Sequence, residues 1–490
     1  MENQTETTVD RRRRVILFPL PYQGHINPML QLANLLYSKG FSITILHTNY
    51  NKPKTSNYPH FTFRFILDND PHDERYSNLP LHGMGALSRV LLFNQYGADQ
   101  LRHQLEQELS AKDEPSVSCL ITDALWHFAQ LVADSLSLPR LVLRTSSLFS
   151  FLIYASIPLL DDRGYLSLSD NTTTPILDGL GYHDLSDNTT TPILDGLGYH
   201  DLSDNKRLEE QVEEFPMLKV KDIVKMGFKR EKDDVVGVID NMVKQMKASS
   251  GIIWNSFKEL EESELETIRR DIPAPSFPIP FAKHFTASSS SLLEHDRSFF
   301  PWLDQQPPKS VVYVSFGSIA QVEEKQFMEM VHGLVDSKQS FLWVVRPGFV
   351  SDSTWLETLP DGFLSEKGRI VKWAPQQEVL GHEAIGAFWT HCGWNSTLES
   401  VCEGVPMICS PFRGDQPLDA RYVSDVWKVG VYLENGWKRE EITNAIRRVM
   451  ADEEIRERSR VLKQKLYGSL MKGGSSYESV ESLVAYVSSF

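Results

Sequence analysis

The chain has 490 residues, which predicts at least two domains because single hydrophobic cores rarely grow beyond about 300 residues. Apolar residues make up 41% and charged residues 23% of the sequence, so the composition is that of a globular protein and not of a disordered one. The net charge of −15 argues against a nucleic-acid-binding protein, because such proteins present a basic face.

The cysteines and the N-terminus indicate a cytoplasmic protein. None of the four cysteines forms a CxxC pair, so neither a zinc knuckle nor a disulfide framework is indicated. Four arginines at 11–14 precede the apolar run 15–20, which is too short for a secretory signal and is interpreted as the first strand after a basic arm. No run of about 18 apolar residues occurs, so no membrane span is predicted.

The first half of the chain alternates apolar strands with helical patterns. Residues 15–20 (VILFPL) predict a strand, and PYQGHINP predicts a turn that places Pro28 near the first position of a helix. Leu30, Ala33 and Leu36 then recur at helical spacing. Further strands are predicted at 41–48, 117–123, 140–146 and 251–257. A strand–helix–strand unit of this kind predicts a parallel sheet.

An internal repeat interrupts this pattern. LSDNTTTPILDGLGYHD, residues 168–184, recurs unchanged at 185–201. Two copies are too few for a solenoid. The Asn, Thr, Pro and Gly content predicts a tolerated surface-loop insertion.

The second half repeats the α/β pattern after a segment rich in Pro and Ser, 271–296, which predicts an inter-domain linker. Strands are predicted at 310–318, 340–346, 368–373, 384–390 and 405–411, and helices at 323–337 and 395–404. We therefore predict two doubly wound, Rossmann-like α/β domains facing across a cleft. Their predicted bounds are 1–270 and 297–470, with a last helix in 471–490 that packs back on the N-terminal domain.

A candidate anion site lies in FWTHCGWNSTLES, residues 388–400, where a predicted strand becomes a helix. A helix N-terminus has partial positive charge and unpaired N–H groups, and it therefore binds phosphate readily. His391, Asn395 and Ser396 add hydrogen-bond donors. The same residues also suit an ordinary capping box, with Asn395 or Ser396 paired with Glu399. No GxGxxG motif is present at this turn or after the first strand, which argues against a nicotinamide or flavin cofactor.

Residues 373–416 resemble the signature box of plant family-1 UDP-dependent glycosyltransferases in length and in marker residues: WAPQQEVLGHEAIGAFWTHCGWNSTLESVCEGVPMICSPFRGDQ. The Gly-His turn near the N-terminus, the Asp that ends a later strand and SFGS at 315–318 extend the resemblance, whereas the tandem repeat departs from it. The resemblance implies the GT-B fold and the transfer of glucose from UDP-glucose, with no additional cofactor.

The resemblance also implies which residues bind the nucleoside. Trp373 should stack on uracil, and the backbone of Ala374 should hydrogen-bond the edge of that base, with Gln376 alongside. Glu399 should accept hydrogen bonds from the ribose hydroxyls, a role that suits a carboxylate.

The diphosphate and the sugar are assigned in the same way. Polar residues should hold the diphosphate: Ser318, His391, Asn395 and Ser396. The sugar should contact Trp394, Asp415 and Gln416, and a glutamine at this last position favours UDP-glucose in the family. Thr145 and Ser146, at the end of a predicted strand, are expected to touch the donor sugar from across the cleft.

A histidine and an aspartate are candidates for the catalytic pair. His25 follows the first predicted strand and Asp123 ends another, so both lie at the carboxyl edge of a parallel sheet, where ligands bind in such folds. A single histidine there could equally be a loop residue. The family uses these positions as base and partner, and a histidine of ordinary pKa, about 6.5, suits removal of a hydroxyl proton. No GxSxG elbow occurs, which argues against a hydrolase.

The expected reaction is a single in-line displacement that inverts an α-linked donor to a β-glucoside. His25 takes the acceptor proton, and the helix N-terminus near Asn395 stabilises the departing UDP. This stabilisation makes a metal unnecessary, and the acidic pair Asp68–Asp70 is not expected to bind one.

The acceptor pocket is expected in the N-terminal domain. Apolar and aromatic side chains are assigned to it, with the alternative that about half of such residues belong to the core: Met84, Leu87, Leu91, Phe149, Phe151 and Tyr154. The acceptor is expected to be a small lipophilic plant metabolite or its glycoside, and both a steviol-type diterpenoid glycoside and a flavonoid or other phenol remain open. A nucleotide-sugar-binding protein without turnover and a UDP-sugar epimerase or hydrolase are the competing functions. The chain is expected to be monomeric.

Overall fold

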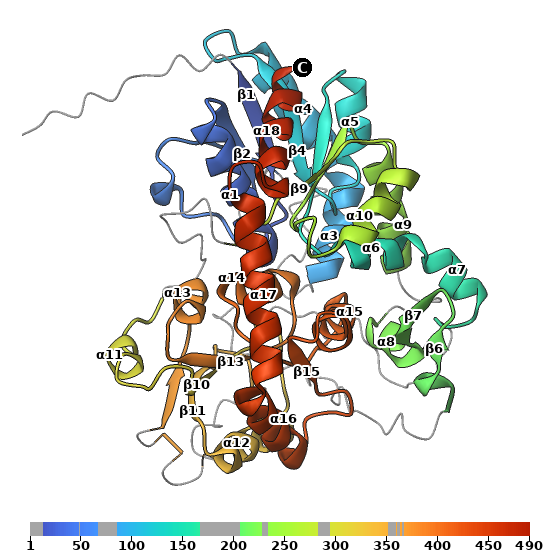
Figure 1. The fold of residues 1–490 in the computed structure, drawn as a ribbon. Helices are drawn as coiled ribbons and strands as arrows, with labels where there is room; N and C mark the ends of the chain where they lie inside the picture. The colour runs from blue at the N-terminus through green and yellow to red at the C-terminus, as the bar shows by residue number, and fades with distance from the viewer. Residues whose placement is uncertain are drawn as a thin grey trace, which may run out of the picture.

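The computed structural model shows two lobes, the N-terminal one above the C-terminal one in Figure 1. It describes residues 13–48, 50–66, 86–166, 206–227, 234–282, 295–350, 359, 363–364 and 367–490. The tandem repeat at 168–201 and the acidic pair Asp68–Asp70 lie outside the described residues.

The N-terminal lobe is built on a seven-stranded sheet whose described pairings are all parallel. In spatial order its strands are β3 (Thr62–Phe65), β2 (Ser42–His47), β1 (Arg14–Phe18), β4 (Val117–Asp123), β5 (Arg140–Arg144), β8 (Gly251–Trp254) and β9 (Ser276–Pro278). Its helices are α1 (Gln23–Ser38), α3 (Ala86–Tyr96), α4 (Ala98–Ser110), α5 (Ala129–Ser135), α6 (Leu148–Ala155), α7 (Ile157–Asp162), α8 (Val220–Lys225), α9 (Asp234–Lys247) and α10 (Glu262–Asp271). A small hairpin, β6 (Gln211–Val212) and β7 (Phe215–Lys219), lies beside α8.

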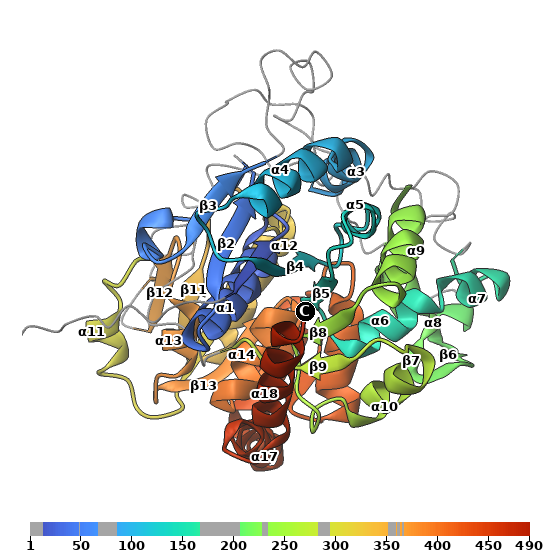
Figure 2. The ribbon, with the colours of Figure 1, turned by 90° about the horizontal axis from the view of Figure 1, so that it is seen from above.

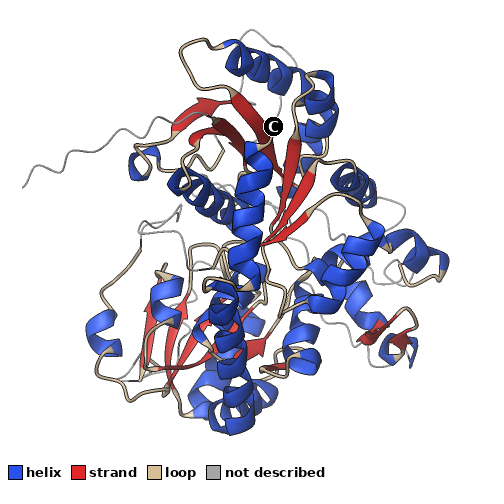
Figure 3. Cartoon of the chain, turned by 45° about the horizontal axis from the view of Figure 1, so that its top comes forward, coloured by secondary structure: helices blue, strands red, loops and turns tan. Residues whose placement is uncertain are grey.

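The C-terminal lobe repeats this plan with a six-stranded parallel sheet. Its spatial order is β12 (Gly368–Val371), β11 (Ser340–Val344), β10 (Val311–Ser315), β13 (Ile385–Thr390), β14 (Met407–Cys409) and β15 (Gly430–Tyr432). Its helices are α11 (Phe300–Leu303), α12 (Glu324–Ser337), α13 (Gln376–Leu380), α14 (Trp394–Glu403), α15 (Gln416–Arg421), α16 (Arg439–Ala451) and α17 (Glu453–Leu470). Figure 3 shows both sheets in red with helices around them, which confirms the predicted pair of doubly wound domains.

The strands form because their apolar runs are buried on both faces. In β1, Val15 and Leu17 pack into a cluster with α1, whereas Ile16 and Phe18 pack into a cluster with α3, α4 and α5. Successive side chains of a strand point to opposite faces, so a run such as RVILF fits only between two helical layers. Figure 2 shows these layers from above, with α3 and α4 on one side of the sheet and α1 on the other.

The helix that carries the candidate base begins earlier than predicted. The segment PYQGHINP was expected to be a turn, but α1 begins at Gln23. His25 therefore lies in the first turn of the helix, and Pro28 lies inside the helix rather than near its first position.

The segment predicted as a linker is partly built into the N-terminal lobe. β9 falls within 271–296 and pairs with β8 at the edge of the sheet. Residues 283–294 lie outside the described residues.

The end of the chain crosses from one lobe to the other. α17 packs on the C-terminal lobe through Leu462 and Leu466, and α18 (Ser475–Ser488) buries Leu483 and Val487 in the core that contains β1. In Figure 1 these two red helices run from the lower lobe to the upper one. Within the described part of the chain, no helix has both the length and the apolar character needed to cross a bilayer.

We expect Leu483→Ala to lower the free energy of unfolding by about 2–5 kcal/mol, because it opens a cavity at a fully buried position. Urea unfolding measures this change. Ser482→Ala, at an exposed position of the same helix, is the control and should leave the midpoint nearly unchanged. Equal stability of the two variants would show that α18 does not contribute to the core.

Candidate active site between the lobes

The candidate residues lie where each sheet reverses its strand order. β1 lies between β2 and β4, and β10 lies between β11 and β13. His25 follows β1 and Asp123 ends β4, while Ser318 follows β10 and His391 follows β13. Such switch points at the carboxyl ends of strands are where open α/β sheets bind ligands. The two switch points therefore supply the two halves of one site.

His25 and Asp123 form the expected hydrogen-bonded pair. His25 Nδ1 lies 2.7 Å from Asp123 Oδ2, and Leu125 N donates to Asp123 Oδ1 at 3.0 Å. The Asp123 side chain is 1% exposed, whereas the His25 side chain is 24% exposed. A buried carboxylate that accepts the Nδ1 proton orients the ring and leaves Nε2 as the basic nitrogen.

Thr145 also contacts this pair. It follows β5, and its Oγ1 lies 3.0 Å from His25 Nδ1. The prediction assigned Thr145 to the donor sugar, whereas the structure places its hydroxyl on the base. Its neighbour Ser146 is half-buried. Since Nδ1 carries a single proton, Thr145 and Asp123 share one N–H of His25 as acceptors.

The N-terminus of α14 is not closed by a side chain. The helix begins at Trp394 after Gly393, and among the described residues no side chain caps it. The alternative capping box is therefore not formed. Glu399 instead accepts hydrogen bonds from Gln376 Nε2 at 2.7 Å and from Gln377 Nε2 at 3.0 Å. The partial positive charge of the helix end stays available to an anion.

The carboxylate of Glu399, which was predicted to bind the ribose, is hydrogen-bonded to two glutamines. Besides Glu399, Gln376 Nε2 also donates to Ser396 Oγ at 2.9 Å, so the uracil, ribose and phosphate candidates form one network. Burial raises the pKa of Glu399, while the hydrogen bonds from Gln376 and Gln377 oppose the rise. Ribose hydroxyls would have to share or replace these amide donors.

His391 is held between two glycines. A Cβ atom on Gly317 would lie 2.8 Å from ring atoms Cε1 and Nε2 of His391, and one on Gly393 would lie 2.5 Å from Nε2. The φ of Gly317 is +69°, which side-chain-bearing residues rarely adopt. Burial and then the positive charge of Arg346 lower the pKa of His391 to about 4, so the ring is neutral at neutral pH. Its Nδ1 is buried, and no described residue hydrogen-bonds to it.

Trp394 and Asn395 join the two lobes. Trp394 Nε1 donates to the backbone oxygen of Asn255 at 2.6 Å, and Asn395 Nδ2 donates to the backbone oxygen of Gly24 at 2.6 Å. Asn395 Oδ1 accepts from Asn255 Nδ2 at 2.8 Å. The predictions gave these side chains to the sugar and the diphosphate. In the structure the polar atoms of both side chains form hydrogen bonds to the N-terminal lobe, because α14 begins directly opposite the first turn of α1.

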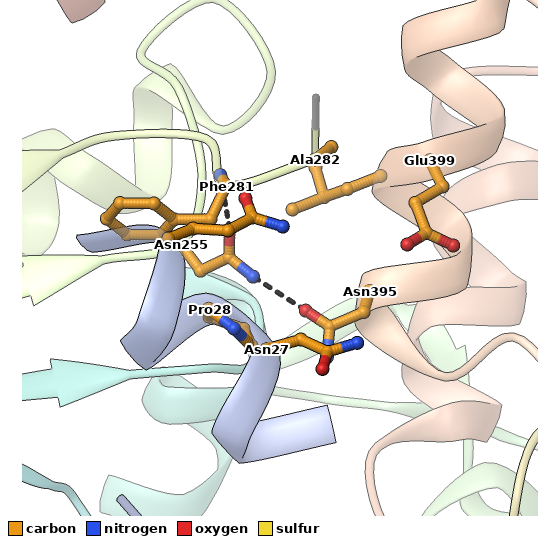
Figure 4. Close-up of a pocket in the computed structure, with 9 residues that line it drawn as sticks. Asn27, Pro28, Asn255, Phe281, Ala282, Asn395 and Glu399 are labelled. Carbon is orange, nitrogen blue, oxygen red and sulfur yellow. Dashed lines mark hydrogen bonds between the residues drawn. The ribbon is translucent and has the colours of Figure 1, made fainter. Parts of the chain in front are cut away.

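A pocket opens beside this contact, between the start of α1 and the first turns of α14. It is lined by Asn27, Pro28, Gln31, Asn255, Phe281, Ala282, Asn395, Leu398 and Glu399. Figure 4 shows the dashed bond from Asn255 to Asn395, with the carboxylate of Glu399 on the same helix as Asn395.

Other predicted donor residues lie around the same helix end. Trp373 is partly buried, and its backbone oxygen accepts from Asp296 N at 2.9 Å, while Ala374 is buried. Ser318 is half-buried in the turn after β10. Asp415 precedes α15, and Gln416 Oε1 accepts from the backbone N–H groups of its own loop, which leaves Nε2 as the remaining donor of this amide.

The acceptor predictions are partly wrong. Phe149 and Phe151 are 3% and 1% exposed and belong to the core. The Phe149 ring packs 4.5 Å from the ring of Tyr422, and the Phe151 ring packs 5.2 Å from that of Trp254 in β8, measured between ring centroids. Leu91 is half-buried against the core. Tyr154 is also half-buried, and the Arg144 guanidinium lies 5.2 Å from its ring centroid. Met84 and the side chain of Leu87 lie outside the described residues.

Sequence reasoning missed Asn255, Gln377 and Gly24. Asn255 follows β8 at the carboxyl edge of the sheet, so its position was a usable signal. The spacing of Gly24 and Pro28 was a second signal. A proline four residues after Gly24 cannot donate the helical hydrogen bond to the Gly24 carbonyl, so this carbonyl was a candidate for a contact elsewhere. Among the described residues, no group of three or more His, Cys, Asp or Glu side chains is placed to hold a metal ion.

Two Rossmann-like lobes facing each other through their switch points form the GT-B architecture of nucleotide-sugar-dependent glycosyltransferases. The family model "UDP-glucoronosyl and UDP-glucosyl transferase" matches residues 254–465. UDP-glycosyltransferase 76G1 of Stevia rebaudiana is 66% identical over 493 residues, covering 100% of both chains. UDP-glycosyltransferase 76C4 of Arabidopsis thaliana is 45% identical over 97% of this chain and 98% of its own. The chain therefore belongs to the UDP-glycosyltransferase family and is a glycosyltransferase enzyme.

Solved structures share the fold. A UDP-glucose: anthocyanidin 3-O-glucosyltransferase in complex with UDP matches with a TM-score of 0.75 and 24% identity, covering 98% of this chain and 100% of that one. UGT2 of Phytolacca americana, complexed with UDP-2fluoro-glucose and pterostilbene, matches with a TM-score of 0.74 and 26% identity, covering 97% of this chain and 100% of that one.

We expect Gly317→Ala to weaken UDP binding about tenfold, because the added methyl group displaces His391 and the loss of one charge-assisted hydrogen bond costs about 1.5 kcal/mol. Calorimetric titration with UDP measures the affinity. Gly40→Ala is the matched control, since Gly40 also has a positive φ, +95°, but nothing within 4 Å of the added atom. A loss of affinity in both variants would assign the effect to backbone strain alone.

The lowered pKa of His391, about 4, predicts a pH-dependent stability. Between that value and about 6.5 the unfolded chain binds a proton that the folded chain excludes, so this histidine reduces the free energy of unfolding as the pH falls. Relative to His391→Gln, the wild type should lose up to about 2 kcal/mol between about pH 7.5 and pH 5. Urea unfolding of both proteins at the two pH values measures this difference. A difference that does not change with pH would contradict the lowered pKa.

Proposed function

We propose that the chain is an inverting glucosyltransferase that moves glucose from UDP-glucose to a hydroxyl of a small lipophilic plant metabolite or its glycoside. The observation that carries this proposal is the His25–Asp123 pair, whose Nδ1 and Oδ2 atoms lie 2.7 Å apart. His25 lies in the first turn of α1, which is hydrogen-bonded to the N-terminal turn of α14. A base on one lobe thus faces an anion-binding helix end on the other.

In the proposed reaction His25 Nε2 removes the acceptor proton while the acceptor oxygen attacks the anomeric carbon. The bond from that carbon to the β-phosphate oxygen breaks, UDP leaves with its electron pair, and inversion yields a β-glucoside. Asp123 stabilises the imidazolium that forms, and the proton is later lost to water. The charge that develops on UDP is stabilised by the dipole and N–H groups of α14, together with His391, Ser396 and Ser318. No additional cofactor is proposed.

The remaining donor contacts are proposed from the family resemblance. Trp373 and Ala374 would hold uracil, and Glu399 would bind the ribose after exchanging its bonds to Gln376 and Gln377. Asp415 and Gln416 would contact the sugar, with glucose favoured by Gln416.

For the acceptor we propose a steviol-type diterpenoid glycoside, with a flavonoid or other phenol as the second candidate. The second candidate is supported by the structure of UGT2 from Phytolacca americana, which is complexed with the phenol pterostilbene. Incubation with UDP-glucose and a panel of both acceptor classes, followed by mass spectrometry of the products, tests the proposal. UDP release without acceptor would indicate a hydrolase, and UDP binding without any turnover would indicate a nucleotide-sugar-binding protein.

We expect His25→Ala to lower turnover by about 10² to 10⁴, because the acceptor hydroxyl loses its general base. Acceptor-dependent UDP release measures the rate, and calorimetry should find the UDP affinity nearly unchanged. His103→Ala, which removes an exposed histidine of α4, is the control and should retain full activity. Loss of UDP binding in His25→Ala would refute the assignment of His25 as the base.

A further inference from the structure

The carbonyl of Gly24, one residue before the proposed base, cannot make its ordinary helical hydrogen bond. In an α-helix the carbonyl of residue i accepts the N–H of residue i+4. Four residues after Gly24 lies Pro28, inside α1, and proline has no N–H. The segment GHINP therefore presents a backbone acceptor beside His25 that needs a donor from elsewhere.

Asn395 supplies this donor from the opposite lobe. Its Nδ2 lies 2.6 Å from the oxygen of Gly24. A Cβ on Gly24 would lie 3.3 Å from Asn395 Nδ2, a tight contact, so a side chain there would crowd the amide. Figure 4 shows Asn395 extending from α14 toward Asn27 and Pro28 of α1.

Asn255 holds Asn395 in this position. Asn255 Nδ2 donates to Asn395 Oδ1 at 2.8 Å, and Asn255 Oδ1 accepts from Phe281 N at 2.9 Å. The backbone oxygen of Asn255 accepts from Trp394 Nε1 at 2.6 Å. Both ends of the Asn395 amide are thus bonded to the N-terminal lobe, and its orientation is determined by a donor on one side and an acceptor on the other.

We propose that Asn395 is a positioning residue that ties the first turn of α1 to the helix that receives the leaving group, and thereby places His25 relative to the donor. This inference rests on the proposed function. Sugar transfer requires the base, the acceptor oxygen and the anomeric carbon to be aligned, and a shift of about 1 Å can cost about 10²-fold in rate. On the other lobe, Pro28 leaves the carbonyl of Gly24 without its helical donor, and this carbonyl is the acceptor that Asn395 binds.

The first test compares Asn395→Ala with wild type. Loss of the tie should lower kcat about 10- to 100-fold at saturating UDP-glucose, whereas UDP affinity measured by calorimetry should remain nearly unchanged. Asn255→Ala should act in the same direction, and the double variant should lose no more than the larger single effect, because both residues serve one contact. A large loss of UDP affinity with unchanged kcat would overturn the proposal and make Asn395 a diphosphate ligand only.

The second test separates positioning from stability. Pro28→Ala restores a backbone N–H that can satisfy the Gly24 carbonyl within α1, without any contact to the other lobe. In the Asn395→Ala background we expect this change to recover thermal stability but not kcat, with Pro28→Ala alone as the reference. Recovery of both thermal stability and kcat would overturn the proposal, because it would show that the Gly24 carbonyl needs only a hydrogen-bond donor and not a bond to the other lobe.

A third measurement does not need turnover. Amide hydrogen exchange of residues 25–27 should speed up in Asn395→Ala, since the first turn of α1 loses its anchor. Lys225→Met is the matched control, because it removes a different inter-lobe bond, from Lys225 Nζ to the backbone oxygen of Glu434 at 2.8 Å, and should alter neither this exchange nor kcat. If exchange is faster in Asn395→Ala but the wild-type protein is inactive with every acceptor, the inter-lobe contact is supported and the proposed function is rejected. Unchanged exchange in Asn395→Ala would reject the tie.

Discussion

The contact between the first turn of α1 and the N-terminus of α14 determines how the two halves of the site face each other. Each half lies at the switch point of its own sheet, so its internal geometry is set by strand order. Their relative placement depends on hydrogen bonds of 2.6 to 2.8 Å made by Trp394 and Asn395. Because Gly24 immediately precedes His25, the same contact brings the proposed base close to the uncapped N-terminus of α14.

A second interface, away from this contact, keeps the lobes aligned. Arg421 of α15 donates from Nε and Nη2 to Asp222 of α8, both at 3.1 Å, and the two side chains are 4% and 0% exposed. Breaking such a buried pair by removing one partner typically costs about 3–5 kcal/mol. Ser147 donates to Asp419 at 3.0 Å in the same region. Together with α17 and α18, these contacts join the lobes at a distance from the site.

In the proposed reaction, the donor side would stabilise the charge of the leaving group mainly with dipoles. His391 is neutral at neutral pH because burial and Arg346 lower its pKa to about 4, and burial raises the pKa of Glu399. A diphosphate would meet the uncapped end of α14, the buried Nδ1 edge of His391 and nearby hydroxyls. Dipoles that are already oriented need little reorganisation as the leaving group gains charge, which is the condition for effective transition-state stabilisation.

The sequence by itself determined the two-sheet architecture, the family and the pairing of His25 with Asp123. The architecture follows from local patterns, namely apolar runs buried on both faces and helical spacing. The family follows from the resemblance of residues 373–416, and that resemblance together with the strand-end positions implied the pairing of His25 with Asp123. Only the tertiary structure decided the partners of Thr145, Asn395 and Glu399, and the burial of Phe149 and Phe151. A side chain at a strand or helix end has several partners within reach, and the choice among them depends on tertiary packing that no local pattern encodes. For Asn395 the choice also depends on how the two lobes are placed relative to each other. The start of α1 shows the same limit, because a glycine–histidine segment before a proline suits a turn until an amide from the other lobe satisfies its free carbonyl.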